Sequence, residues 1–319
     1  MKNQNQNKPA ELHCLDKRYA TTRFVVDTPP APNHEAGCEF QFQLQLPVNQ
    51  GRQGEGGLRT KGNYKISLPN KPLITVITVV FNGASTIEDT IQSVLNQTYS
   101  NIEYIIIDGG SNDGTVDILK QYEHAIDYWV SEKDSGLYDA MNKGITLASG
   151  TYIGMLNADD LFAGREVMQD YADRFCATNV DAIFSSLNIV EQGNIKKILR
   201  KYRIGRLGAW MLRIGVMPAH PTFYCKRSCL ESAGPYNTSY RIAADFEMLV
   251  RLCVKQKISW EFLDKVSVVM RSGGVSNSGL LARIKLNGEI IRACRESGLY
   301  TNALLLALKL PLRLFELIR

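Results

Sequence analysis

The sequence predicts an α/β fold: a Rossmann-like, mixed but mostly parallel sheet flanked by helices, with an N-terminal extension and a C-terminal helical tail. Two β-branched apolar runs, over 73–81 and 102–108, are typical of strands buried on both faces of a sheet. Segments with apolar residues at helical spacing follow each of them. Strand and helix therefore alternate at short intervals, which favours a largely parallel sheet.

The first half of the chain gives the clearest elements. The helix over 85–97 begins at a Ser/Thr cap and carries Ile87, Ile91, Val94 and Leu95 at helical spacing. The next expected elements are a helix over 115–123, a strand over 126–132, a helix over 135–150 and a strand over 151–156.

Beyond residue 160 the pattern is looser. We expect a helix over 165–175, a strand over 181–186, a hairpin over 187–202 turning at Gly193-Asn194, a helix over 205–215, a strand into a turn over 219–227, an amphipathic helix over 243–255, and two short strands over 258–263 and 266–271.

We expect three segments that differ in amino-acid composition. Residues 1–70 are rich in polar, Gly and Pro stretches and form an extension, partly disordered or with a hairpin, in which EFQFQLQL (39–46) alternates like a half-buried strand. The main domain covers 71–275. Residues 276–319 form a leucine-rich helical tail.

Composition narrows the class of protein. The formal charge of +5 is mild and does not point to nucleic acid, and we expect no nucleic-acid partner. The seven scattered cysteines indicate reduced thiols in a cytosolic protein. The first residues have no apolar core of a signal peptide, and no run of about 18 apolar residues suggests a spanning helix.

Several side chains lie where strands end. In parallel sheets, ligands bind outside the carboxyl ends of the strands. The residues at or just past such ends are Phe81, Asp108, Glu132, Asp134, Asp159 and Asp160. An aromatic ring and several acids therefore converge on one edge of the sheet.

LNADD (156–160) is the most informative of these ends. Adjacent carboxylates repel unless a positive group lies near them. A solvated loop with an Asp helix cap is one interpretation. The other is an Mg²⁺ or Mn²⁺ site on Asp159 and Asp160, because these cations prefer oxygen ligands and share their shell with substrate phosphates.

Four other residues are candidates with open alternatives. Phe81 either stacks on a base or packs in the core, and Asp108 suits a hydrogen bond from a nucleobase imide or a ribose hydroxyl. Asp245 lies at a helix start, where it either serves the helix dipole or acts as a general base. His220 is either structural or a phosphate or metal contact.

Two basic or amphipathic stretches suggest surfaces. Residues 195–214 hold seven Lys/Arg and no acid, which fits a solvated hairpin and helix, or a surface for an anionic acceptor or lipid head groups. The tail places Lys309, Arg313 and Glu316 on one helical face. It is either an interfacial membrane helix or a helix that packs on the domain or on a second subunit.

With these residues in view, the sequence resembles the family-2 glycosyltransferases, which have a GT-A fold. The resemblance covers about 72–255, and SEKDSGLYDAMNKGI within it is similar to bacterial polysaccharide-assembly transferases. The matching motifs, in order, are ITVVFNG, SVLNQTY, IEYIIIDGGSNDGT, DAMNKGI, LNADD, HPTFY and ADFEMLVR.

The resemblance implies a donor site for a nucleotide-diphosphate sugar, with a UDP-sugar expected first. Phe81 matches the base-stacking position and Asp108 an acid that contacts the nucleoside. The other implied donor-binding residues are Lys143, Asn157, Asp159 and His220, and the implied metal ligands are Asp159 and Asp160, for Mg²⁺ or Mn²⁺.

The resemblance also implies a reaction. Asp245 matches the catalytic base, which takes the proton of an acceptor hydroxyl during one inverting displacement. We also expect a saccharide or lipid-linked acceptor in cell-surface polysaccharide synthesis, which fits the basic stretch and the tail, and an enzyme attached peripherally to the inner face of the membrane. Asn157, Gly109-Gly110 and Ala244 depart from the family pattern, since many relatives have an acid at these sites.

Two other functions are alternatives to glycosyl transfer, and each predicts different sequence features. A sugar nucleotidyltransferase needs a Gly-rich phosphate loop with a basic residue after the first strand, whereas the turn here, FNGAST, has no Lys or Arg. A non-catalytic nucleotide-sugar-binding module would keep the fold and lose the chemistry.

Overall fold

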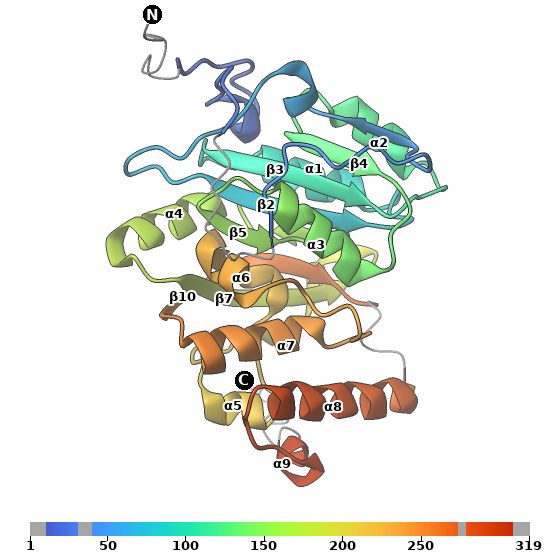
Figure 1. The fold of residues 1–319 in the computed structure, drawn as a ribbon, viewed down its shortest axis with the longest axis vertical. Helices are drawn as coiled ribbons and strands as arrows, with labels where there is room; N and C mark the ends of the chain where they lie inside the picture. Colours follow the sequence, from blue (N-terminus) through green and yellow to red (C-terminus); the bar gives the residue numbers. More distant parts are fainter. Residues whose placement is uncertain (1–10, 31–39, 274–278, 309–319) are drawn as a thin grey trace, which may run out of the picture.

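The computed structural model describes residues 11–30, 40–273 and 279–308. Their centre is one sheet with the strand order β1-β4-β3-β2-β5-β9-β7-β10-β6, to which β8 is added by pairing with β7 (Figure 1). This mixed sheet with helices on both faces confirms the predicted fold class.

Four neighbouring parallel strands form the predicted core of the sheet. They are β2 (Ile74–Val80), β3 (Ile102–Asp108), β4 (Tyr128–Ser131) and β5 (Tyr152–Met155). Every residue of all four strands is buried, as the β-branched runs predicted.

Helices cover this core on both faces. Along β2, Ile77 and Val79 face one hydrophobic cluster, while Ile74, Val76 and Val80 face the other. The first cluster includes α3 (Leu137–Leu147), α6 (Arg227–Ala233) and α7 (Ala244–Val250), and the second includes α1 (Ile87–Leu95), α2 (Thr115–Tyr122) and α4 (Val167–Thr178).

The second half of the sheet is antiparallel in part. β9 (Tyr224–Lys226) runs antiparallel to both β5 and β7 (Ala182–Glu191), and β7 is parallel to β10 (Trp260–Arg271). The predicted hairpin is confirmed as β7 and β8 (Asn194–Tyr202), although its turn lies at Gln192-Gly193.

Three predictions about strands were wrong. The two short strands expected over 258–271 form one strand, β10, with register shifts where the break was expected. Asp160 lies in a short strand, β6 (Asp160–Phe162), where a loop was expected. Residues 40–46 form no strand, because their neighbour is α3, whose end offers only Thr146 O to Gln43 N.

The described part of the extension contributes to the sheet. β1 (Gly54–Gly56) forms an edge of the sheet by pairing with β4, and Arg59, in the short 3₁₀ helix η2 (Arg59–Lys61), reaches the buried Glu103 of β3 at 2.5 Å. Thr75 Oγ1 and Ser149 N also donate to Glu103, at 2.6 and 2.8 Å. Burial alone would raise the pKa of Glu103, but Arg59 and these donors outweigh it and lower the pKa.

The C-terminal part is helical as far as it is described. α8 (Gly279–Glu296) packs on α7, and α9 (Ala303–Ala307) follows (Figure 1). The residues expected to form the polar face of the tail, Lys309, Arg313 and Glu316, lie outside the described residues. Among the described helices, none has both the length and the apolar character that a bilayer crossing requires.

The remaining short helices are η1 (Ala20–Thr22), α5 (Ala209–Arg213), η3 (His220–Thr222) and the π-helix η4 (Arg251–Gln256).

We predict that Arg59→Met lowers the free energy of unfolding by about 3–5 kcal/mol, because it leaves the Glu103 carboxylate buried without its cation. Chemical denaturation measures the loss. Since the folded pKa of Glu103 is lowered, the stabilisation is present above the unfolded pKa and is lost as the pH falls. The difference between the two proteins should therefore shrink below about pH 4.

Lys61→Met is the matched control, since its ion pair with Glu123 is exposed. It should leave the stability nearly unchanged. Equal losses for both variants would contradict the role assigned to Arg59.

Candidate active site

The carboxyl ends of β2, β3, β4 and β5 lie at one edge of the sheet, because the four strands are neighbours and parallel (Figure 1). The structure therefore brings together the segments that begin at Phe81, Gly109, Glu132 and Asn157. We call this edge the rim.

Two loops of the rim are tied to each other by hydrogen bonds. Asn82 N donates to Ser111 Oγ at 2.7 Å, Gly83 N to Thr115 Oγ1 at 3.0 Å, and Ala84 N to Asp113 Oδ2 at 2.9 Å. Phe81 precedes this set of contacts and is 67% exposed. The core-packing alternative for Phe81 is therefore wrong, and its ring is available to a ligand.

The Asp108 carboxylate forms its hydrogen bonds with groups of the protein itself. Its carboxylate is fully buried and accepts hydrogen bonds from Ser111 N at 2.9 Å, Ser131 Oγ at 2.5 Å, Gly110 N at 3.2 Å and the Ser111 hydroxyl. These donors come from the Gly109–Ser111 loop and from β4. Asp108 thus fixes the shape of the loop, and it offers the nucleoside no exposed oxygen.

The LNADD segment separates its two acids. The Asp159 side chain is half-buried, whereas Asp160 is fully buried. Asp160 Oδ2 accepts a hydrogen bond from Asn157 Nδ2 at 2.9 Å, and Oδ1 has no hydrogen-bond partner among the described residues. Burial, with the charge of Asp159, raises the pKa of Asp160 to about 8.

An orphaned buried carboxylate beside a second carboxylate fits a divalent cation. Mg²⁺ in particular is held by one or two protein carboxylates together with substrate phosphates. In the parts of the chain that the structure describes, no cluster of three or more acidic, His or Cys side chains could hold a metal. A two-carboxylate site is therefore the largest that LNADD supports.

Arg271 is a neighbour of LNADD that sequence reasoning missed. It is nearly buried at the end of β10, donates to the backbone oxygen of Asp159 at 2.9 Å, and pairs with Asp89 at 2.5 Å. Thr90 Oγ1 donates to the backbone oxygens of Ala158 and Asp160, at 3.0 and 2.8 Å. The backbone of LNADD is thus held from α1 and from β10.

Lys143 has an acidic partner. Its ammonium lies 3.0 Å from Glu132, which also accepts from Arg52 of the extension at 2.9 Å. Glu132 and Lys143 line an open cavity of about 530 Å³ whose other wall is the extension, residues 46–50. Lys143 therefore lies beside the rim, with its charge shared with Glu132.

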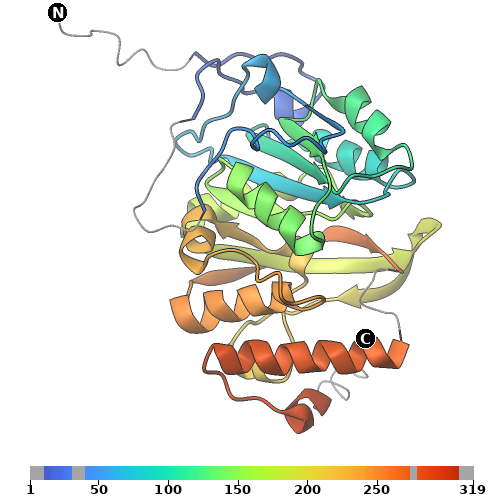
Figure 2. The ribbon, with the colours of Figure 1, turned by 45° about the vertical axis from the view of Figure 1, so that its right-hand side comes forward.

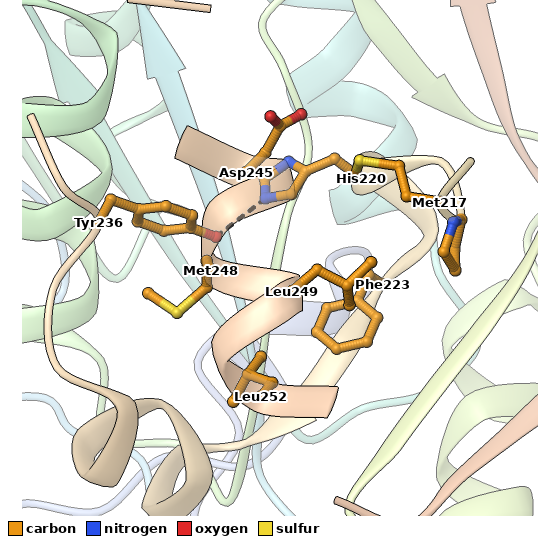
Figure 3. Close-up of a pocket in the computed structure, with 9 residues that line it drawn as sticks. Met217, His220, Phe223, Tyr236, Asp245, Met248, Leu249 and Leu252 are labelled. Atoms are coloured by element: carbon orange, nitrogen blue, oxygen red, sulfur yellow. Dashed lines mark hydrogen bonds between the residues drawn. The ribbon is translucent and has the colours of Figure 1, made fainter. Parts of the chain in front are cut away.

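Asp245 and His220 meet in a second pocket (Figure 3). Asp245 is at the start of α7, where its Oδ1 accepts from Phe246 N at 2.7 Å, and its side chain lies next to the His220 ring. His220 Nε2 is 2.9 Å from the Tyr236 hydroxyl. The rest of the narrow pocket, of about 10 Å³, is apolar and is lined by Met217, Pro218, Phe223, Met248, Leu249 and Leu252.

Burial changes the protonation of this pair. It raises the pKa of Asp245, against the opposing effect of His220, and it lowers the pKa of His220. Burial therefore disfavours the charged form of each group. A carboxylate with a raised pKa is a stronger base than an ordinary Asp, as a general base requires.

Two contacts connect this pocket to the rest of the fold. Tyr138, at the start of α3 just past the rim, donates to Ile242 O at 2.7 Å. Glu289 of α8 accepts hydrogen bonds from the backbone N–H groups of Arg241, Ile242 and Ala243, at 2.9–3.0 Å. Glu289 thus fixes the backbone that leads into Asp245, and no local sequence signal indicates this role.

Comparison with known proteins identifies the family of this chain. The sequence model of glycosyl transferase family 2 matches residues 75–230. An uncharacterized glycosyltransferase of Mycobacterium tuberculosis is 32% identical over 194 residues, which are 58% of this chain and 70% of the relative. The chain belongs to glycosyltransferase family 2. A PGL/p-HBAD biosynthesis glycosyltransferase of Mycobacterium bovis is 27% identical over 222 residues, 65% of this chain and 80% of the relative.

Solved structures support the GT-A fold. Staphylococcus aureus TarS in complex with UDP-GlcNAc aligns with a TM-score of 0.59 at 15% identity, covering 72% of this chain and 67% of that one. A mannosyltransferase of Pyrobaculum calidifontis in complex with GDP-Man and Mn²⁺ aligns with a TM-score of 0.53 at 18% identity, covering 73% of this chain and 66% of that one. The family-2 glycosyltransferase described here therefore has the predicted GT-A architecture.

We predict that Asp108→Asn lowers the free energy of unfolding by about 2 kcal/mol, because the amide group presents a donor to protein groups that are themselves donors. Urea denaturation measures the loss, and hydrogen exchange at Ser111 N should accelerate. Asp117→Asn, on the exposed surface of α2, is the control and should change neither quantity. Normal exchange at Ser111 in the Asp108 variant would refute the loop-shaping role.

Proposed function

We propose that this glycosyltransferase is inverting and metal-dependent, and that it moves a sugar from a nucleotide-diphosphate donor to an acceptor hydroxyl. The observation that carries the proposal is the Asp245 carboxylate, half-buried beside His220 in a pocket that adjoins the rim. The raised pKa of Asp245 suits proton transfer from a hydroxyl.

The donor is proposed to bind along the rim, with a UDP-sugar as the first candidate. The exposed ring of Phe81 would stack on the base, and Asp108 would shape the nucleoside wall as a positioning residue. Asn157, Asp159, Lys143 and His220 remain the proposed donor-side residues. The complexes of TarS with UDP-GlcNAc and of the mannosyltransferase with GDP-Man support a nucleotide-sugar donor on this fold.

The cation, Mg²⁺ or Mn²⁺, would be held by Asp159, with Asp160 beside it. When bound, it would supply positive charge to the diphosphate. The orphaned Oδ1 of Asp160 supports this assignment, and so does the Mn²⁺ that accompanies GDP-Man in the mannosyltransferase.

In the proposed reaction, Asp245 accepts the proton of the acceptor hydroxyl. The acceptor oxygen forms a bond to the anomeric carbon while the bond from that carbon to the diphosphate oxygen breaks. The bond pair leaves with the nucleoside diphosphate, and the single displacement inverts the configuration. Glu289 and Tyr138 hold the start of α7 so that the Asp245 carboxylate keeps its position.

We further propose a saccharide or lipid-linked acceptor in cell-surface polysaccharide synthesis, with the enzyme attached peripherally to the inner face of the membrane. The M. bovis relative is named for PGL/p-HBAD biosynthesis, which supports a biosynthetic role for this chain. The nucleotidyltransferase alternative is disfavoured, because the turn after β2 has no Lys or Arg to hold phosphates. The non-catalytic alternative is left to the experiments below.

We predict that Asp245→Asn retains donor binding and lowers sugar transfer by about 10²–10⁴-fold, because the amide cannot accept the proton. Donor binding is measured by calorimetry, and transfer by release of the nucleoside diphosphate in the presence of acceptor. In the wild type, the rate should fall as the pH drops through the raised pKa of Asp245.

Glu247→Gln serves as the matched control on the same helix, because Glu247 pairs with Arg251 and does not line the pocket. It should retain transfer. If Asp245→Asn transfers sugar as the wild type does, Asp245 is not the base.

We predict that Mn²⁺ raises the melting temperature in the presence of UDP by more than either ligand raises it alone, because the cation links Asp159 to the diphosphate. Differential scanning fluorimetry measures the shift. Asp159→Asn should abolish the metal-linked part and Asp117→Asn should preserve it. A wild type with no metal-linked shift for any nucleotide would exclude the metal-dependent donor site.

A further inference from the structure

The β7–β8 hairpin is a surface that the proposed reaction does not use. Among the strands that the structure describes, β8 pairs only with β7, off the main path of the sheet, and its residues are exposed or half-buried throughout. Figure 2 shows the yellow-green tip of the hairpin projecting from the right-hand side of the molecule. Packing in the protein core therefore does not account for the apolar side chains of β8.

The hairpin combines exposed apolar and basic side chains. Ile195 is 47% exposed, and Ile198 and Leu199 are each 48% exposed. Four basic residues alternate with them, namely Lys196, Lys197, Arg200 and Lys201, and no acid occurs from 195 to 214. Lys197 pairs with Glu191, which directly precedes the turn of the hairpin. The surface therefore offers positive charge and hydrocarbon together, as an anionic bilayer interface requires.

The hairpin tip lies on the same side of the sheet as the rim. β9 is antiparallel to both β5 and β7, so β5 and β7 point in the same direction. The turn after β7 is therefore at the edge where LNADD follows β5. Val190 of β7 is in register with Arg271 of β10, and Arg271 donates to Asp159 O.

We propose that residues 195–201 of the β7–β8 hairpin dock the enzyme on an anionic membrane surface, with the rim facing the bilayer. The lysines lie at the head groups while Ile195, Ile198 and Leu199 enter the boundary with the acyl chains. A lipid-linked acceptor would then diffuse to the rim in two dimensions. This placement extends the proposed acceptor class, but its test requires no transfer reaction.

Co-sedimentation of the full chain with phosphatidylcholine vesicles, with and without phosphatidylglycerol, tests the docking. Wild type should bind only the anionic vesicles. The double variant Lys196→Glu/Lys201→Glu should bind at least about tenfold more weakly, since each basic side chain near such a surface adds to the attraction. Lys120→Glu/Lys255→Glu is the control, with the same change of net charge at exposed sites outside the hairpin, and it should bind as the wild type does.

A second pair of variants separates the apolar contribution. Ile195→Ser/Leu199→Ser should weaken binding even where salt screens the lysines, while Leu12→Ser/Leu15→Ser, at residues of similar exposure, should not. Thermal melts verify that each variant is folded.

Three results would overturn the docking surface. The first is a wild type that does not bind anionic vesicles, and the second is hairpin variants that bind as their controls do, which would locate the contact elsewhere, such as in the tail. The third is binding of a soluble polyanion without binding of vesicles, which would assign the basic residues to a soluble acceptor. Because donor binding is measured by calorimetry without vesicles, each of these results leaves the proposed reaction standing.

Discussion

Burial of four parallel strands on both faces is the constraint on which the site depends. Side chains along β2, β3, β4 and β5 contact helices above and below, so polar groups are costly there unless they are paired. The strand ends are the places where the chain leaves the core. Because the strands are parallel and adjacent, their ends are also adjacent, and the polar residues that the core excludes collect along one edge.

The buried and half-buried carboxylates of this protein differ in how many hydrogen-bond donors surround them. Glu103 and Asp108 are buried with donors for their oxygens, and they hold the extension and a rim loop in place. Asp160 is buried with one oxygen unsatisfied, while Asp245 lies half-buried beside an imidazole. The protein thus uses fully paired acids for stability and leaves incompletely paired acids near the places where we propose a ligand.

The spacing of apolar residues predicted those helices and strands that depend mainly on residues close together in the sequence. The buried strands, the amphipathic helices and the hairpin follow from residue periodicity, so the rim could be predicted from strand ends alone. Asp108 was assigned to a ligand because its donors come from the Gly109–Ser111 loop and from Ser131 of β4, and residue periodicity does not report these contacts. The strand at Asp160 and the contacts of Arg271 and Glu289 depend on segments distant in the chain, so the sequence around each residue carries no sign of them.

The carboxylate of Glu289 holds the backbone before Asp245 from a helix near the end of the chain. During synthesis on the ribosome, the parallel strands and the rim emerge before α8. The nascent chain can therefore assemble its donor-side edge well before the segment leading to Asp245 is fixed. The position of the proposed base is therefore fixed only after α8 has been synthesised.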